Sequence, residues 1–162
     1  MKNYIIEIRW AFIFTVASLL WAGIEKLVGM HDSNIGTQPV FSLLFGIPAI
    51  AIYGLALLEK KQKVYNGNMS WKEATVSGIV LSLFVAVLSP IAQWAIYTLI
   101  SPEFFPKAIQ FYTDKKIVTE ARAIEMFNIQ AYMKKGITES LSMGVITSAL
   151  VALIVKTKNP KS

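Results

Sequence analysis

Four long, uncharged apolar stretches alternate with polar connections along this chain. A helix needs about 20 apolar residues to cross roughly 30 Å of hydrocarbon. Counting between charged residues predicts spans over about residues 10–30, 39–58, 74–100 and 137–155. The third is the clearest, because no charge occurs between Ala74 and Pro102, whereas Glu25 and Lys26 lie near one end of the first. The pattern predicts an all-α integral membrane protein with four spanning helices in one domain, residues 1–162.

The connection between the third and fourth spans, residues 101–136, is too long for a structureless loop in a compact protein. Its first part contains Phe104, Phe105 and Phe111, and its second part, from about Thr119, has apolar residues at helical spacing. We expect an amphipathic helical hairpin that lies on the bundle or in the headgroup layer. A lid, or a docking element whose phenylalanines contact a partner, is the alternative.

A local signal marks the start of the third helix. Asn-Gly-Asn at residues 66–68 is typical of a turn, because Gly and Asn tolerate positive φ. Ser70 and Glu73 have the spacing of a capping box, in which each side chain accepts a hydrogen bond from the other residue's backbone amide. The third helix is therefore expected to begin at Trp71.

Small residues recur where helices in lipid would approach one another closely. They lie in the fourth span at Ser140, Gly144, Ser148 and Ala152, in the second at Ser42 and Gly46, and in the third at Gly78 and Ser82. Packing of the four helices and formation of a homo-oligomer would both use such stripes. Pro90 predicts a kink in the third helix, and the hydroxyl of Ser89 is placed to satisfy the freed backbone group.

Lysine and arginine are distributed unevenly between the ends of the spans. Nine lie in the N-terminal segment, the second connection and the tail, at Lys2, Arg9, Lys60, Lys61, Lys63, Lys72, Lys156, Lys158 and Lys161. Residues 30–38 contain none, and the six in the third connection are mixed with acidic residues. The positive-inside rule then predicts cytoplasmic N- and C-termini. No small-x-small site precedes Glu25, which favours an uncleaved anchor over a signal peptide.

Composition agrees with a membrane protein, since 54% of the residues are hydrophobic and 16% are charged, against about 25% charged in soluble domains. The net charge of +6 is attributed to topology and anionic lipid, because no aromatic residues interleave with a basic stripe as nucleic-acid binding requires. The chain has no cysteine, and its single histidine, His31, stands beside Asp32. One His and one Asp make neither a metal site nor a catalytic triad. We therefore expect no enzyme, cofactor or metal.

Three polar residues fall in the outer half of the predicted membrane region: Glu25, Gln93 and Glu139. Ionisable groups at such depth are rare and often functional. Beside a kink at Pro90, they are a candidate polar cluster for a cation or a small polar ligand. The simpler interpretation places both carboxylates at the interface, with Glu25 facing water beside Lys26.

Several segments resemble one family. They are the Asn66-Gly67 turn, Ser70-Trp71-Lys72-Glu73-Ala74 opening an apolar helix, WAIYTLISPEF at 94–104, and GVITSALVALIV at 144–155 before a basic tail. Over roughly residues 5–158 the chain resembles the bacterial membrane family called domain of unknown function 4199 (DUF4199). The resemblance implies a four-span protein of the bacterial inner membrane and carries over no catalytic residue. The segment between spans three and four is less acidic here than the family leads us to expect.

Two hypotheses of function follow. The first is a non-enzymatic membrane component that binds a protein or lipid partner through its bundle face and hairpin. The second is a small transporter or channel-like protein that uses the polar cluster. A membrane enzyme is the least favoured class. Partners other than the lipid bilayer, the ligand and the oligomeric state do not follow from the sequence.

Overall fold

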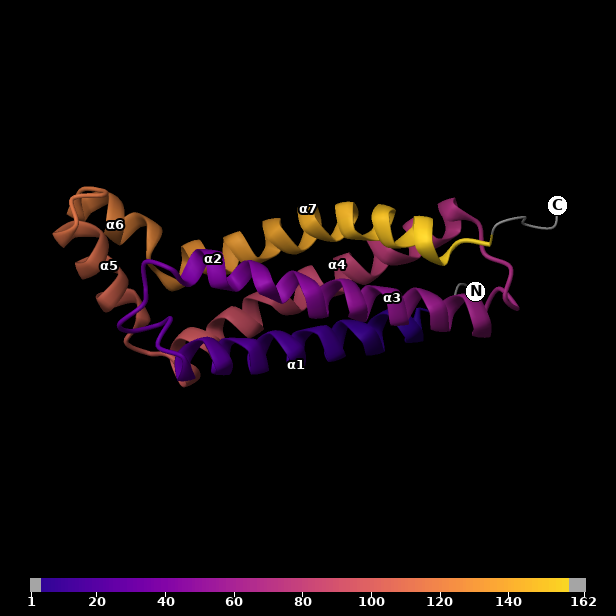
Figure 1. The fold of residues 1–162 in the computed structure, drawn as a ribbon, viewed down its shortest axis with the longest axis horizontal. Coiled ribbons are helices and arrows are strands. Elements are labelled where there is room, and N and C mark those ends of the chain that lie inside the picture. Colours follow the sequence, from indigo (N-terminus) through magenta and orange to yellow (C-terminus); the bar gives the residue numbers. More distant parts are fainter. Residues whose placement is uncertain (1–3, 158–162) are drawn as a thin grey trace.

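The computed structural model describes residues 4–157, and these form four long helices side by side with two short helices at one end (Figure 1). The long helices are α1 (Ile5–Leu27), α3 (Gly46–Lys63), α4 (Trp71–Ala95) and α7 (Ile129–Val155). The shorter elements are α2 (Gln38–Ser42), the 3-10 turn η1 (Leu43–Phe45), the π-helical turn η2 (Ile96–Ile100), α5 (Phe104–Asp114) and α6 (Glu120–Met126). The predicted all-α fold, with a helical hairpin between spans three and four, is confirmed.

Four segments are long and apolar enough to cross a membrane: Ile5–Leu27, Gln38–Lys63, Trp71–Ile100 and Ile129–Val155. Two of them begin more than one helical turn earlier than counting between charges predicted. The first starts at Ile5 rather than Trp10 because the charge of Glu7 lies inside the bundle, next to Lys60. The fourth starts at Ile129 rather than near residue 137 because Asn128 caps it, its side chain accepting a hydrogen bond from the amide of Ala131.

Helix α4 is the most buried of the four and packs along α7 through small residues. A Cβ added at Gly78 would lie 2.6 Å from the Cβ of Ser148, and one added at Gly144 would lie 2.5 Å from the Cβ of Ser82. Both distances are too short for a side chain, so glycine permits this close approach. Gly144 and Ser148, two of the residues predicted for helix packing, lie at this contact between α4 and α7, and Ala152 is fully buried.

The start and the interior of α4 follow their local signals. Ser70 and Glu73 form the predicted capping box, and α4 begins at Trp71. The helix continues through Pro90. Pro90 has no amide to donate to the carbonyl of Ala86, and the Ser89 hydroxyl donates to that carbonyl over 3.0 Å. The predicted compensation by Ser89 is thus confirmed, while the kink stays a prediction.

Helices α5 and α6 form a cap over one end of the bundle (Figure 1). Phe104, Ala108, Ala123 and Phe127 are buried there together with Ile35 from the connection after α1. We call this the cap end. We call the opposite end, where α1 begins and α7 ends, the terminal end (Figure 1).

Candidate functional site

Two clusters of buried ionisable side chains occupy opposite ends of the bundle. The cap-end cluster centres on Glu25, which is 5% exposed, and His31, which is 2% exposed. The terminal-end cluster centres on Glu7 and Lys60, which are 3% and 6% exposed. Buried charges are costly unless they are paired and hydrogen-bonded, so their partners decide what each cluster can do.

In the cap-end cluster His31 bridges a serine and a carboxylate. Its Nδ1 lies 2.6 Å from Oγ of Ser101, and its Nε2 lies 3.1 Å from Oε2 of Glu25. The carboxylate of Glu25 also accepts from the Ser42 hydroxyl at 2.5 Å and from the Trp21 indole at 3.0 Å. The amide of Gln38 is a longer donor, at 3.4 Å. Glu25 therefore receives hydrogen bonds from α1 itself, from α2 and from the connection between them.

Local backbone geometry brings these residues together. Gly29 has φ of +79°, which glycine adopts without a steric cost, and the chain turns back there so that Met30 donates its amide to the carbonyl of Glu25. Ser101 follows the π-helical turn η2, and its amide donates to Ile96. The ring of Phe104 meets the His31 ring edge to face at 5.1 Å. The cap thus closes over the histidine.

The order serine, histidine, carboxylate is that of a nucleophile, a base and an orienting group. However, Ser101 is 4% exposed, and neither of the two pockets described below is lined by it. What the arrangement does in this conformation is join α1, the following connection and the end of α4. Sequence reasoning missed it, because His31 and Ser101 are 70 residues apart and share no motif.

The predicted polar cluster is not assembled as a unit. Gln93 lies against Gly136 of α7, and its Oε1 is buried without a hydrogen-bond partner among the described residues. Glu139 is exposed, with Lys135 3.7 Å away. The hydrogen bonds and ion pairs found among residues 4–157 connect neither residue to Glu25.

Two predicted packing residues of the second span have different surroundings. Ser42 of α2 donates a hydrogen bond to Glu25 of α1. Gly46 is exposed, and a Cβ there would meet nothing within 4 Å, so no helix of the described chain packs against it. Ser140, at the start of the stripe on α7, is half-buried.

The three phenylalanines of the hairpin pack against other parts of the described chain. Phe104 is 2% exposed and lies 4.9 Å from the Tyr97 ring, and Phe105 lies 4.8 Å from the same ring. The ring of Phe111 occupies the space in which a side chain at Gly36 would lie. Phe104 in particular is not available as an exposed contact for a partner.

An exposed ion pair fastens the cap to the connection after α1. Lys107 of α5 pairs with Asp32 and, at 2.7 Å, with Glu103. The hydrogen bond from Lys107 holds the pKa of Asp32 below its ordinary value of 3.8. The same bond with Asp32 raises the pKa of Lys107.

At the terminal end, Glu7 of α1 is held by two other helices. Lys60 of α3 lies 2.8 Å from Oε1 of Glu7, and the hydroxyl of Ser77 of α4 donates to the same oxygen at 2.6 Å. The carboxylate of Glu7 therefore connects α1 to both α3 and α4. The sequence showed the two charges but not their pairing across 53 positions.

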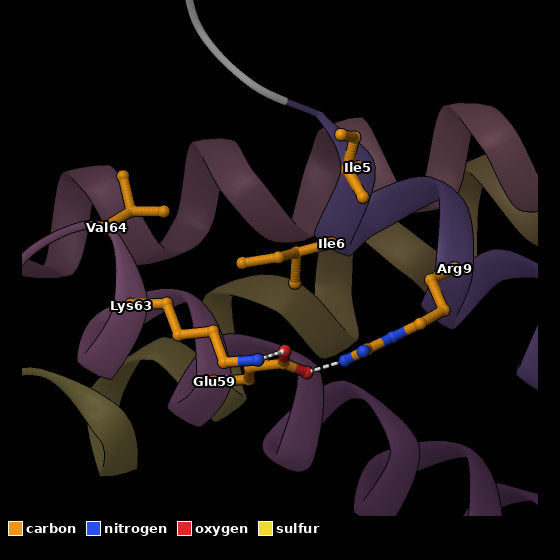
Figure 2. Close-up of a pocket in the computed structure, with 6 residues that line it drawn as sticks. All are labelled: Ile5, Ile6, Arg9, Glu59, Lys63 and Val64. Carbon is orange, nitrogen blue, oxygen red and sulfur yellow. Dashed lines mark hydrogen bonds and ion pairs between the residues drawn. The ribbon is translucent and has the colours of Figure 1, made fainter.

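Two pockets open at the terminal end. The smaller, about 270 Å³, lies between the start of α1 and the end of α3, where Glu59 pairs with Arg9 and Lys63 (Figure 2). The larger, about 550 Å³, is lined by residues of α1, α3, α4 and the connection before α4. Its polar lining includes Tyr4, Lys60, Tyr65 and Lys72, and its apolar lining consists of Val64, Val76 and Val80.

Comparison with known protein families gives a match over most of the chain. The family model described as Protein of unknown function (DUF4199) matches residues 9–157. No curated protein and no solved structure matches the chain.

Proposed function

The chain belongs to the DUF4199 family, and on that premise we propose that it is a non-enzymatic component of the bacterial inner membrane that binds anionic phospholipid at its terminal end. The coarser statement, a four-span membrane protein, follows from the four apolar helices and the family match. The specific partner, the membrane and the orientation are our proposal.

The supporting observation is where the positive charge lies. The described lysines and arginines at the terminal end are Arg9, Lys60, Lys61, Lys63, Lys72 and Lys156, and the acidic residues there are Glu7, Glu59 and Glu73. At the cap end seven basic residues balance seven acidic ones, with His31 counted as neutral. The whole excess of three positive charges in residues 4–157 is therefore at the terminal end.

That asymmetry favours a cytoplasmic terminal end by the positive-inside rule. The cytoplasmic leaflet is rich in anionic lipid, and each nearby Lys or Arg contributes about 1 kcal/mol of attraction to it. Burial of Ser101 supports the non-enzymatic part of the proposal, because a nucleophile must reach its substrate.

Orientation is tested with single cysteines, since the chain contains none. Gln62→Cys places a thiol at the terminal end, and Lys115→Cys places one in the cap. We expect a membrane-impermeant maleimide to label Lys115→Cys in intact spheroplasts and Gln62→Cys only after lysis. The reverse pattern would overturn the orientation.

Lipid preference is tested by native mass spectrometry of protein released from nanodiscs of equal phosphatidylglycerol and phosphatidylcholine with identical acyl chains. We expect phosphatidylglycerol to be retained in excess. Equal retention of the two lipids would refute the proposed function.

A transporter is the second candidate, and one observation favours it: Oε1 of Gln93 is buried between α4 and α7 without a hydrogen-bond partner among residues 4–157. Transport through this region would give ion or solute flux in proteoliposomes that Glu25→Gln or Glu139→Gln abolishes. Our proposal predicts flux no greater than in protein-free liposomes. Flux that depends on either carboxylate would favour the transporter instead.

A further inference from the structure

The larger terminal-end pocket has one polar wall and one apolar wall. Tyr4, Lys60, Tyr65 and Lys72 contribute hydrogen-bond donors, while Val76 and Val80 lie one helical turn apart along α4. Val76 is 45% exposed. The apolar strip therefore leads from the polar wall along a helix that crosses the membrane.

The carboxylates that line this pocket already have partners. Glu7 is held by Lys60 and Ser77. Glu73 accepts from both the amide and the hydroxyl of Ser70, at 2.8 and 2.7 Å. The charge of Glu7 is thus offset by Lys60, and one oxygen of Glu73 accepts its hydrogen bonds from Ser70 within the fold.

Several donors of the pocket, by contrast, are uncommitted. Among the described residues, Lys72 has no ion pair and the hydroxyls of Tyr4 and Tyr65 have no hydrogen bond. Burial, together with the charges of Glu73 and Glu7, raises the pKa of Tyr65, so that this hydroxyl stays protonated and can donate. An ammonium and two phenolic donors line this pocket beside carboxylates that already have partners, and such donors suit an anionic group rich in oxygen atoms, such as phosphate.

We infer that this pocket binds one phospholipid with an anionic headgroup. Its phosphate lies against Lys72 and the two tyrosine hydroxyls, and one acyl chain follows Val76 and Val80. The inference deepens the proposed function and rests on it, because it assigns the lipid preference of the terminal end to a single site. Lys60 contributes positive charge to the site while remaining paired with Glu7.

The test uses full-length protein in detergent, titrated with phosphatidylglycerol and followed by native mass spectrometry. Lys72→Ala removes the free cation from an exposed position. Lys156→Ala is its matched control, because it removes an equal charge at the same end from an exposed residue outside the pocket. Val76→Phe keeps every charge and fills the apolar wall.

We expect Lys72→Ala to weaken the tightest phosphatidylglycerol site roughly fivefold, the effect of one nearby lysine, and Lys156→Ala to change it less than twofold. Val76→Phe is expected to remove that site while the thermal melting temperature stays near that of the wild type. Inorganic phosphate at millimolar concentration is expected not to displace the lipid.

The outcomes separate the site from the broader proposal. Equal loss in Lys72→Ala and Lys156→Ala, with phosphatidylglycerol still preferred, would refute the site and leave the proposed function standing. No preference in the wild type would refute both. Displacement by inorganic phosphate would show that the pocket takes a free phosphate rather than a lipid, and would overturn the inference.

Discussion

Glu25→Ala is the most informative single substitution in this bundle, because it removes the acceptor on which four donors converge. The indole of Trp21, the hydroxyl of Ser42, the amide of Gln38 and the ring of His31 all direct a donor atom at its carboxylate. The substitution leaves them without that partner and also removes a buried charge. We expect destabilisation of the cap end and loosening of the connection after α1.

The magnitude can be bracketed. Side-chain hydrogen bonds in membrane proteins average about 0.6 kcal/mol, so four of them contribute roughly 2.4 kcal/mol. His31 is 2% exposed and would become a buried unsatisfied group, at a cost of about 1–3 kcal/mol, whereas Trp21, Ser42 and Gln38 are half-buried and can find water. Adding the His31 penalty to the hydrogen bonds of the other three donors gives an expected loss of about 3–5 kcal/mol in the free energy of unfolding.

Glu25→Gln should cost less, about 1 kcal/mol. Its remaining oxygen can still accept from Ser42 and Trp21, and its new amide can donate to Nε2 of His31 in the other tautomer. Glu139→Ala is the control, because Glu139 is exposed and its oxygen lies 3.7 Å from Nζ of Lys135. Loss of such an exposed pair should lower the free energy of unfolding by less than about 0.5 kcal/mol.

The assay is reversible unfolding in mixed micelles with increasing SDS, followed by helical circular dichroism and tryptophan fluorescence. The expected order of destabilisation is Glu25→Ala, then Glu25→Gln, then Glu139→Ala. If Glu25→Ala behaved like Glu139→Ala, the hydrogen bonds around Glu25 would not stabilise the fold and the reasoning would be refuted.

Three other predictions concern packing, pH and chemistry. Gly144→Ala should cost about 1–3 kcal/mol in the same assay, because its Cβ would lie 2.5 Å from that of Ser82, and adding Ser82→Gly should restore part of the loss; no recovery would contradict the proposed close approach. Asp32→Asn should lower the melting temperature at neutral pH: the pKa of Asp32 is lowered by Lys107, so its contribution is present above pH 3.8 and is lost as the pH falls through the lowered value. The melting curves of variant and wild type should then converge in acid, and a constant difference would contradict this assignment. Ser101 should not react with a fluorophosphonate probe in folded protein, and labelling that His31→Ala abolishes would revive the enzyme hypothesis.

The four spans and the cap could be predicted from the sequence because they depend on local properties. The length of an uncharged run decides whether a helix can cross the hydrocarbon. The start of α4 was predictable for the same reason, since Ser70 and Glu73 act on amides only three residues away. The role of Ser89 was local too, because the carbonyl that Pro90 leaves free belongs to Ala86, three residues before Ser89.

The ends of the spans were predicted less well, because charge was treated as a boundary. Glu7 lies inside the bundle since Lys60 neutralises its charge and Ser77 donates a hydrogen bond to it, and no pattern near residue 7 reveals partners so far along the chain. For small residues, too, the sequence does not reveal which of them contact a distant helix. Gly144 and Gly46 carry equal sequence signals, but only Gly144 meets another helix of the described chain.

The sequence by itself therefore determined the number of apolar helices, the N-terminal cap of α4, the hairpin and the excess of basic residues. Only the tertiary structure decided that His31 joins Ser101 to Glu25, that the hairpin phenylalanines pack against other parts of the described chain, and that Lys72 faces a pocket with an apolar wall. The physical reason is that periodicity and capping act within one or two helical turns. The partner of a buried charge is chosen by the packing of helices distant in sequence.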